Sequence, residues 1–190
     1  FADIRLRIEV NMNNNYKMPR LIFAGLFFFG FVSAAHSQTL DPGTMDRLRT
    51  ALGQVRHPDQ VDMLQMAQSI APVNTDAYLI ALASQPTSVP GLRLRAYGLL
   101  GHFSASPATK AFLAQQVTRR ELDDSYRQWA LTSYVRAFHD VDPAGVETVV
   151  SSAERDPSLN LREHARVIHQ KMRAGARHPA GELPRRQKAR

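Results

Sequence analysis

The chain has 190 residues, of which 44% are hydrophobic and 22% charged, a composition typical of globular proteins and unlike that of disordered ones. It has a formal net charge of +7 and no cysteine, which excludes disulfides, thiolate metal sites and cysteine nucleophiles. Residues 38–170 hold 13 Lys/Arg against 14 Asp/Glu, whereas residues 171–190 hold seven Lys/Arg and one Glu. Because the body of the chain is nearly neutral, we expect no nucleic-acid partner.

The N-terminal segment has the features of an export signal. Basic residues precede an apolar run at 21–32, and small residues follow at 33–37, with Ala35 and Ser37 at the positions that signal peptidase reads. The apolar stretch is about 15 residues long, short of the roughly 20 that span a bilayer. The sequence therefore predicts cleavage before Gln38 and a periplasmic or secreted protein, with an uncleaved anchor as the alternative.

Three segments are predicted along the chain. Residues 1–37 comprise an upstream extension and a signal at about 12–37, with initiation at Met12 or Met18. Residues 38–173 form a helical repeat domain. The tail at 174–190 has no hydrophobic face and carries clustered cations, so it is expected to be disordered. It either solubilises the chain end or makes weak contact with an anionic membrane or an acidic protein.

Apolar residues recur at three- and four-residue spacings from residue 44 onward, between Pro, Asp, Ser and Gly. The spacing predicts helices over 44–55, 61–70, 75–84, 92–103, 107–119, 126–139, 143–154 and 161–172. Asp59, Ser106 and Asp142 are expected to cap the helices that follow them. Residues 38–43 and 121–125 are expected to form a loop and a turn. Since no stretch alternates like a strand, the predicted fold class is all-α.

A short pattern recurs in three of the predicted helices. Arg93, Arg127 and Arg162 lie 34 and 35 residues apart, and an alanine follows each of them by three residues. With the helices aligned on these arginines, small and apolar residues form columns on one helix face: Leu92/Tyr126/Leu161, Ala96/Ala130/Ala165, Leu99/Ser133/Ile168 and Phe103/Ala137/Met172. This period is typical of helix pairs that bury their apolar faces by stacking.

The pattern resembles HEAT-type repeats, including the HEAT-like repeats of phycobilisome lyases, over roughly residues 61–172. The resemblance implies a short right-handed α-α superhelix of about three to four HEAT-like helix pairs that presents a protein-binding surface. In that family an acidic residue about six positions before the arginine often links neighbouring repeats. Glu121 and Asp156 stand at that position, whereas Thr87 stands there before the first arginine.

The aligned helices also carry basic and aromatic residues at two positions beside the motif. Seven residues separate the members of each pair, close to two helical turns, so each pair shares a face. Trp and Arg are common in binding hot spots. We therefore predict a protein-binding stripe formed by Arg95, His102, Trp129, Arg136, His164 and Lys171. The alternative is that Trp129 fills a gap between repeats while the charged groups face solvent.

No sequence motif indicates catalysis, a metal or a cofactor, and none is expected. His139, Asp140 and Asp142 are better explained as a helix end followed by a capped helix than as metal ligands. His164 and His169, five residues apart, do not share a face as a ligand pair would. The leading prediction is an exported protein-interaction scaffold or accessory subunit that is not an enzyme. The alternative is an enzyme or a lyase-associated HEAT-like factor that acts in the groove.

Overall fold

A computed structural model describes residues 40–55, 59–86 and 88–175. These residues belong to one of the two compact units of the chain, Thr39–Arg190, whereas the other unit, Phe1–Gln38, lies outside them. The predicted signal, its cleavage before Gln38 and nearly all of the basic tail also lie outside the described residues. Every regular element in the described ranges is an α-helix, which confirms the all-α fold class.

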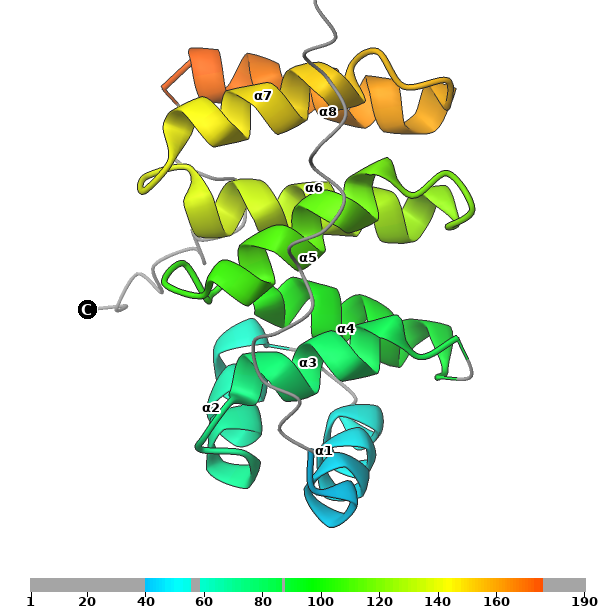
Figure 1. Cartoon of the computed structure of the whole chain (residues 1–190), viewed down its shortest axis with the longest axis vertical. Helices are drawn as coiled ribbons and strands as arrows, with labels where there is room; N and C mark the ends of the chain where they lie inside the picture. Colours follow the sequence, from blue (N-terminus) through cyan, green and yellow to red (C-terminus); the bar gives the residue numbers. More distant parts are fainter. Residues whose placement is uncertain (1–39, 56–58, 87, 176–190) are drawn as a thin grey trace, which may run out of the picture. The chain divides into compact units, whose positions relative to one another are not determined.

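Eight helices follow one another in the described part of the chain (Figure 1). They are α1 (Pro42–Gln54), α2 (Gln60–Ile70), α3 (Thr75–Ser84), α4 (Pro90–Leu100), α5 (Pro107–Thr118), α6 (Asp124–Phe138), α7 (Pro143–Ala153) and α8 (Leu159–Arg173). Each predicted helix has a counterpart among them.

Four of the helices, α1, α4, α6 and α8, begin two residues earlier than their apolar spacing predicts. In each of them the two additional residues precede the first residue of the apolar spacing. The Asp41 carboxylate accepts a hydrogen bond from the Thr44 amide at 2.7 Å, and Asp123 accepts one from the Ser125 amide at 2.8 Å. The loop predicted to extend to residue 43 and the turn predicted to extend to 125 are therefore wrong at their ends.

The three caps predicted from the sequence are confirmed. Asp59 accepts a hydrogen bond from the Val61 amide at 2.7 Å, Ser106 from the Thr109 amide at 3.1 Å, and Asp142 from the Gly145 amide at 3.0 Å. Each side chain satisfies a backbone donor that has no partner inside its helix.

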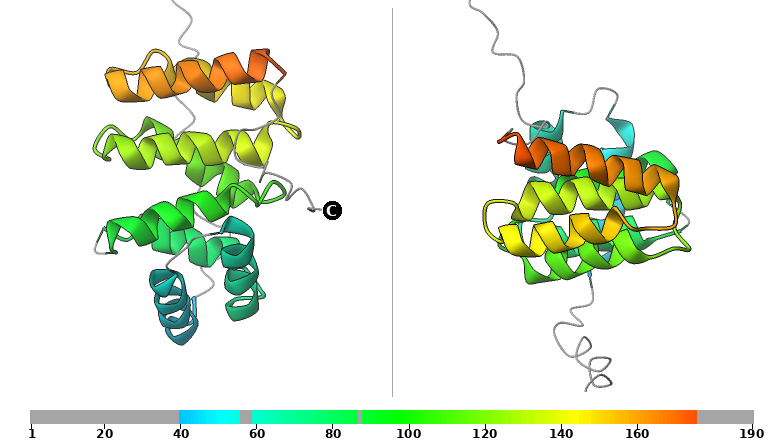
Figure 2. Two further views of the ribbon diagram at one scale, coloured as in Figure 1. Left: turned by 180° about the vertical axis from the view of Figure 1, so that it is seen from behind. Right: turned by 90° about the horizontal axis from the view of Figure 1, so that it is seen from above.

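The last six helices form three consecutive pairs, α3 with α4, α5 with α6, and α7 with α8. Helices α4, α6 and α8 contact one another in succession, as do α3, α5 and α7. The first of these rows faces the viewer in the left view of Figure 2, and the second faces the viewer in Figure 1. Helices α1 and α2 instead contact each other and α4, so the first helix pair does not simply extend the two rows.

The alanine column of the sequence pattern forms a buried seam along the row α4–α6–α8, whereas each of the other three columns contains a partly buried side chain. Ala96, Ala130 and Ala165 each have an exposed fraction of 0%. A small side chain at this position allows neighbouring helices to approach closely. Tyr97, also 0% exposed, packs its ring 5.9 Å from that of Phe112 and 6.1 Å from that of Tyr126, measured between centroids.

The recurrent arginines bind backbone carbonyls at or just after the end of the preceding helix. Nε of Arg93 donates to the Ala83 carbonyl at 3.1 Å, and Nε of Arg127 donates to the Val117 carbonyl at 3.0 Å, ten residues earlier in both cases. Arg162 reaches the carbonyl of Asp156 at 3.1 Å. Because the last carbonyls of a helix lack partners within it, the bonds of Arg93 and Arg127 join the two helices of their pairs. The bond of Arg162 instead attaches α8 to the loop that follows α7.

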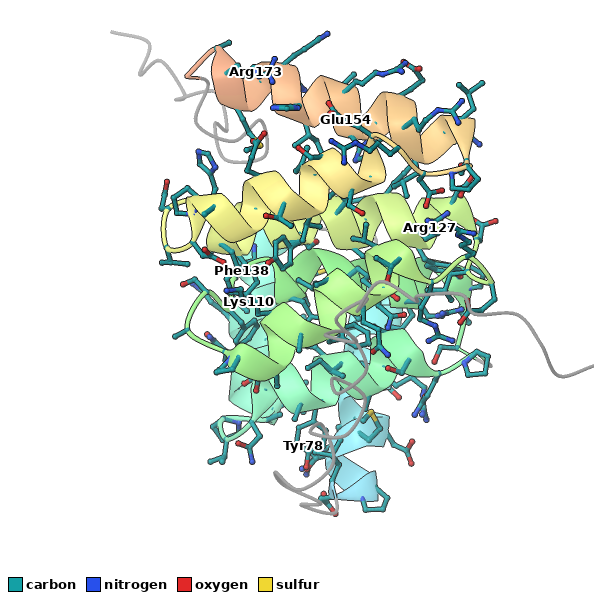
Figure 3. All side chains as sticks on the ribbon, turned by 45° about the horizontal axis from the view of Figure 1, so that its top comes forward. Tyr78, Lys110, Arg127, Phe138, Glu154 and Arg173 are labelled. Carbon is teal, nitrogen blue, oxygen red and sulfur yellow. The ribbon has the colours of Figure 1, made fainter. Side chains whose placement is uncertain are left out.

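One of the acidic positions singled out in the sequence joins neighbouring pairs. Nη2 of Arg127 lies 2.5 Å from Oδ2 of Asp156, and the arginine side chain is 3% exposed (Figure 3). Glu121 instead pairs with Arg119 at 2.7 Å, and the guanidinium of Arg93 stacks on the Tyr126 ring at 4.0 Å. The first junction thus uses an aromatic ring where the second uses a carboxylate.

Further polar contacts connect successive helices within each row. The hydroxyl of Ser106 donates to Asp76 at 2.5 Å, and that of Ser158 donates to Asp124 at 2.6 Å, so these serines cap one helix and bind the preceding one in the row. Lys110 pairs with Asp142 at 2.6 Å and lies near the Phe138 ring (Figure 3).

Candidate binding surface

The six residues of the predicted stripe lie on or directly after α4, α6 and α8, three helices in mutual succession. They differ in accessibility. His102 and Lys171 are exposed, and the other four, Arg95, Trp129, Arg136 and His164, are partly buried. The contacts of these four side chains explain their burial.

Arg95 binds the carboxyl end of α1. Its Nη2 donates to the Val55 carbonyl at 2.8 Å, and its Nη1 donates to the Leu52 carbonyl. A guanidinium at this end of a helix satisfies unpartnered carbonyls and complements the helix dipole. The side chain thereby attaches α1 to α4, a role that the repeat pattern did not predict.

Gln60, at the start of α2, contacts two residues of the predicted stripe. Its Oε1 accepts a hydrogen bond from Nη1 of Arg136 and lies 3.4 Å from Nε2 of His102. Burial lowers the pKa of the Arg136 guanidinium. Burial also lowers the pKa of His102, and the charge of Arg136 lowers it further. Helix α2 therefore covers Arg136, whereas His102 beside it remains exposed.

Trp129 packs between α4 and α6. A Cβ placed on Gly98 would lie 3.4 Å from Cζ3 of the indole, which is ordinary van der Waals contact. At Gly101 the same addition would come within 3.1 Å of Cδ of Arg136 and 3.3 Å of the Ser133 Cα. The absence of a side chain at Gly101 thus allows the close approach of the two helices. These contacts favour the packing interpretation of Trp129, the alternative considered from the sequence.

His164 connects α8 to α6. Its Nε2 lies 2.8 Å from the hydroxyl oxygen of Thr132. Burial lowers the pKa of His164 below its usual value of 6.5, a hydrogen bond with the Gln128 backbone opposes that shift, and the charge of Lys171 adds to it. The folded state therefore favours the neutral imidazole.

This preference predicts a pH-dependent stability. The unfolded chain takes up a proton at His164 as the pH falls below 6.5, while the folded chain resists protonation. The contribution of His164 to the free energy of unfolding is therefore fully present above pH 6.5 and decreases as the pH falls below it. We expect the variant His164→Gln to lose less unfolding free energy than the parent between pH 7.5 and 5.5 in urea titrations. Equal losses in both proteins would contradict this assignment.

One cleft in the described part of the chain lies outside the centre of the stripe. It has a volume of about 530 Å³ and is bordered by α1, the connection from α3 to α4, and the start of α4. Arg95 lines it together with residues that sequence reasoning missed, among them Arg49, Gln85 and Ser88. These come together only because α1 packs against α4, and their spacing in the sequence carries no signal of that contact.

Two of the residues considered as metal ligands, Asp142 and His169, have other roles in the structure. Asp142 caps α7 and pairs with Lys110, in agreement with the helix-boundary interpretation. The described residues contain no cluster of three histidine or acidic side chains with the geometry of a metal site. His169 is 7% exposed and lies between two carboxylates, 2.8 Å from Glu154 and 3.1 Å from Glu147. Because Glu147 lies in α7 and Glu154 directly follows that helix, His169 attaches α8 to the end of α7. Figure 3 marks Glu154 beneath α8.

Neither the apolar character of the helices nor the comparisons with known proteins assign a function to the chain. Among the helices of the described ranges, none combines the length and apolar character needed to cross a membrane. No protein-family model matches the chain, and comparisons with curated proteins and with solved structures find no match.

Proposed function

We propose that this chain is an exported HEAT-like α-solenoid that binds a protein partner as a scaffold or accessory subunit. The observation that carries the proposal is the repetition of contacts from pair to pair. Arg93 and Arg127 bind carbonyls ten residues earlier, and the alanines of their motifs are buried in one continuous seam. Stacked helix pairs of this kind use extended surfaces for protein recognition.

Export is the second part of the proposal. The apolar run at 21–32, followed by small residues up to Ser37, supports cleavage before Gln38 and a periplasmic or secreted location. A chain without cysteine depends on packing and polar contacts for stability in an oxidising compartment. The basic tail, residues 174–190, would then be available for weak contact with an anionic membrane or an acidic protein.

The accessible members of the stripe are the proposed contact points for the partner. His102 and Lys171 are exposed, whereas Trp129 and Arg136 pack against neighbouring helices. Replacing the latter two would disturb α4–α6 packing as well as any binding. Lys171 on α8 is therefore the more informative position for a binding test.

The proposal predicts that Lys171→Glu reduces capture of the native partner while the fold persists. The chain is expressed with its own N-terminus and a C-terminal tag, crosslinked in the cell envelope and captured, and bound proteins are quantified by mass spectrometry. We expect the amount of captured partner to fall about tenfold. The introduced negative charge would face a partner surface that complements the positive charge of Lys171, and like charges oppose association. Arg155→Glu, an exposed site of equal charge change outside the stripe, is the control.

The same captured material tests export. An intact mass that begins at Gln38 is the expected result, and a chain that retains residues 1–37 would contradict cleavage. Equal capture by the Lys171 and Arg155 variants, with unchanged circular dichroism, would contradict the stripe.

A further inference from the structure

The cleft beside α1 combines two guanidinium groups with apolar and neutral polar walls. Arg49 comes from α1 and Arg95 from α4, while Val89 and Leu92 supply apolar surface and Gln85 and Ser88 supply polar groups. None of the described residues lining it is acidic. A volume of about 530 Å³ lies within the range of small-molecule and peptide-end sites.

Both guanidinium groups are positioned before any ligand arrives. Arg95 donates to carbonyls at the end of α1, including that of Val55 at 2.8 Å. Nη2 of Arg49 donates to Oε1 of Gln85 at 3.0 Å, and the same oxygen lies 3.2 Å from the Ser88 hydroxyl. Because folding has already ordered these side chains, a ligand loses less of its binding energy to ordering them.

Both arginines have more N–H groups than the described residues accept. A guanidinium has five N–H donors. Arg95 directs its donors at the carbonyls of Leu52, Gly53 and Val55, and Arg49 directs its donors at Asp46 and Gln85. None of the other described residues accepts a hydrogen bond from the remaining N–H groups of these two side chains. Guanidinium groups bind carboxylates through paired hydrogen bonds.

The net charge of Arg49, Arg95 and Asp46 favours a singly charged anion over a doubly charged one. Asp46 pairs with Arg49 at 2.5 Å, which offsets one of the two positive charges. The remaining excess matches a carboxylate, whereas a phosphate monoester brings roughly two negative charges. The apolar wall includes Val89, 70% exposed, which an aliphatic group would cover.

We propose that this cleft binds a monocarboxylate with an apolar body, either the free C-terminus of a peptide or a small aliphatic acid. Binding requires neither export nor a scaffold role, so its failure and that of the proposed function are separable. Arg49 and Arg95 hold the carboxylate, and Val89 and Leu92 contact the apolar body.

Titration of the full chain tests the assignment. The probes are octanoate, an N-acetylated apolar tripeptide with a free carboxylate, its C-terminal amide, and octyl phosphate. Nuclear magnetic resonance follows the Nε–H signals of Arg49 and Arg95, and calorimetry measures the dissociation constants. We expect both carboxylates to shift these signals and the amide to bind at least about tenfold more weakly, since one hydrogen bond between charged groups accounts for about that factor. The tighter of the two carboxylates identifies the source.

Two variants separate the cleft from general charge effects. Arg49→Gln is expected to weaken carboxylate binding by about tenfold or more. Arg47→Gln removes an equal charge from the same helix, where Arg47 is exposed and bonds to Thr44 outside the cleft, and should leave binding unchanged. Equal effects of the two variants, unshifted arginine signals with every carboxylate, or tighter binding of octyl phosphate than of octanoate would each overturn the proposal.

Discussion

Replacement of Arg127 by alanine is expected to lower the free energy of unfolding by about 4 kcal/mol, because removing one partner of a buried ion pair leaves the other charge uncompensated. The Arg127 side chain is 3% exposed and that of Asp156 is 12% exposed, with 2.5 Å between them. The same change leaves the Val117 carbonyl without its donor. Chemical denaturation at neutral pH measures the loss.

Arg166→Ala is the matched control for this prediction. Arg166 pairs with Glu163 at the same distance of 2.5 Å, but both side chains are more than half exposed. Its loss is expected to cost about 0.5 kcal/mol or less, as for most surface ion pairs. Equal costs at Arg127 and Arg166 would show that burial does not set the contribution of the inner pair.

Acidification provides an independent measure of the Arg127 contact. Burial by itself would raise the pKa of Asp156, but hydrogen bonds from Arg127 and from the Ser158 amide outweigh it and hold the pKa below 3.8. A carboxylate whose pKa is lower in the folded state than in the unfolded state stabilises the fold at any pH above its unfolded-state pKa. That contribution is lost as the pH falls through its folded-state pKa. The difference between parent and Arg127→Ala should therefore narrow below about pH 3.8.

Replacement of Tyr97 by alanine is the second change with a large expected effect. Tyr97 has an exposed fraction of 0% and packs against Phe112 and Tyr126. Removal of a buried aromatic ring leaves a cavity and costs about 3–5 kcal/mol. Thermal and denaturant unfolding should both show the loss.

Tyr97→Phe separates the ring from the hydroxyl. The hydroxyl donates to Oε1 of Gln116 at 3.3 Å, and Gln116 is 2% exposed. Losing this hydrogen bond while keeping the ring should cost about 1 kcal/mol. If the phenylalanine variant were as unstable as the alanine variant, the hydrogen bond and not the packed ring would dominate at this position.

Local chemistry determined the positions of the helices. The three- and four-residue apolar spacing located all eight, and the caps at Asp59, Ser106 and Asp142 were correct because capping depends on residues within one turn. Helix starts at Pro42 and Asp124 were missed, since their first two residues precede the first residue of the apolar spacing. The buried alanine seam was also predictable, because a repeated column at one helical face implies a repeated interface.

The surface was less predictable than the core. Arg95, Trp129 and His164 occupy equivalent positions in the aligned motif, yet each contacts a different neighbour. The first helix pair lacks the arginine motif and packs on α4, so its contacts with Arg95 and Arg136 follow no period in the sequence. Only His102 and Lys171 of the predicted stripe are exposed.

The sequence by itself thus determined the all-α class, the helix boundaries to within three residues and the buried face of the repeated helices, because these depend on short-range spacing and capping. Only the tertiary structure decided which polar residues are accessible and that Arg49 and Arg95 line one cleft. The physical reason is that burial of a polar side chain depends on which helix packs over it. Gln60 lies 76 residues from Arg136 in the chain, and no local pattern encodes their contact.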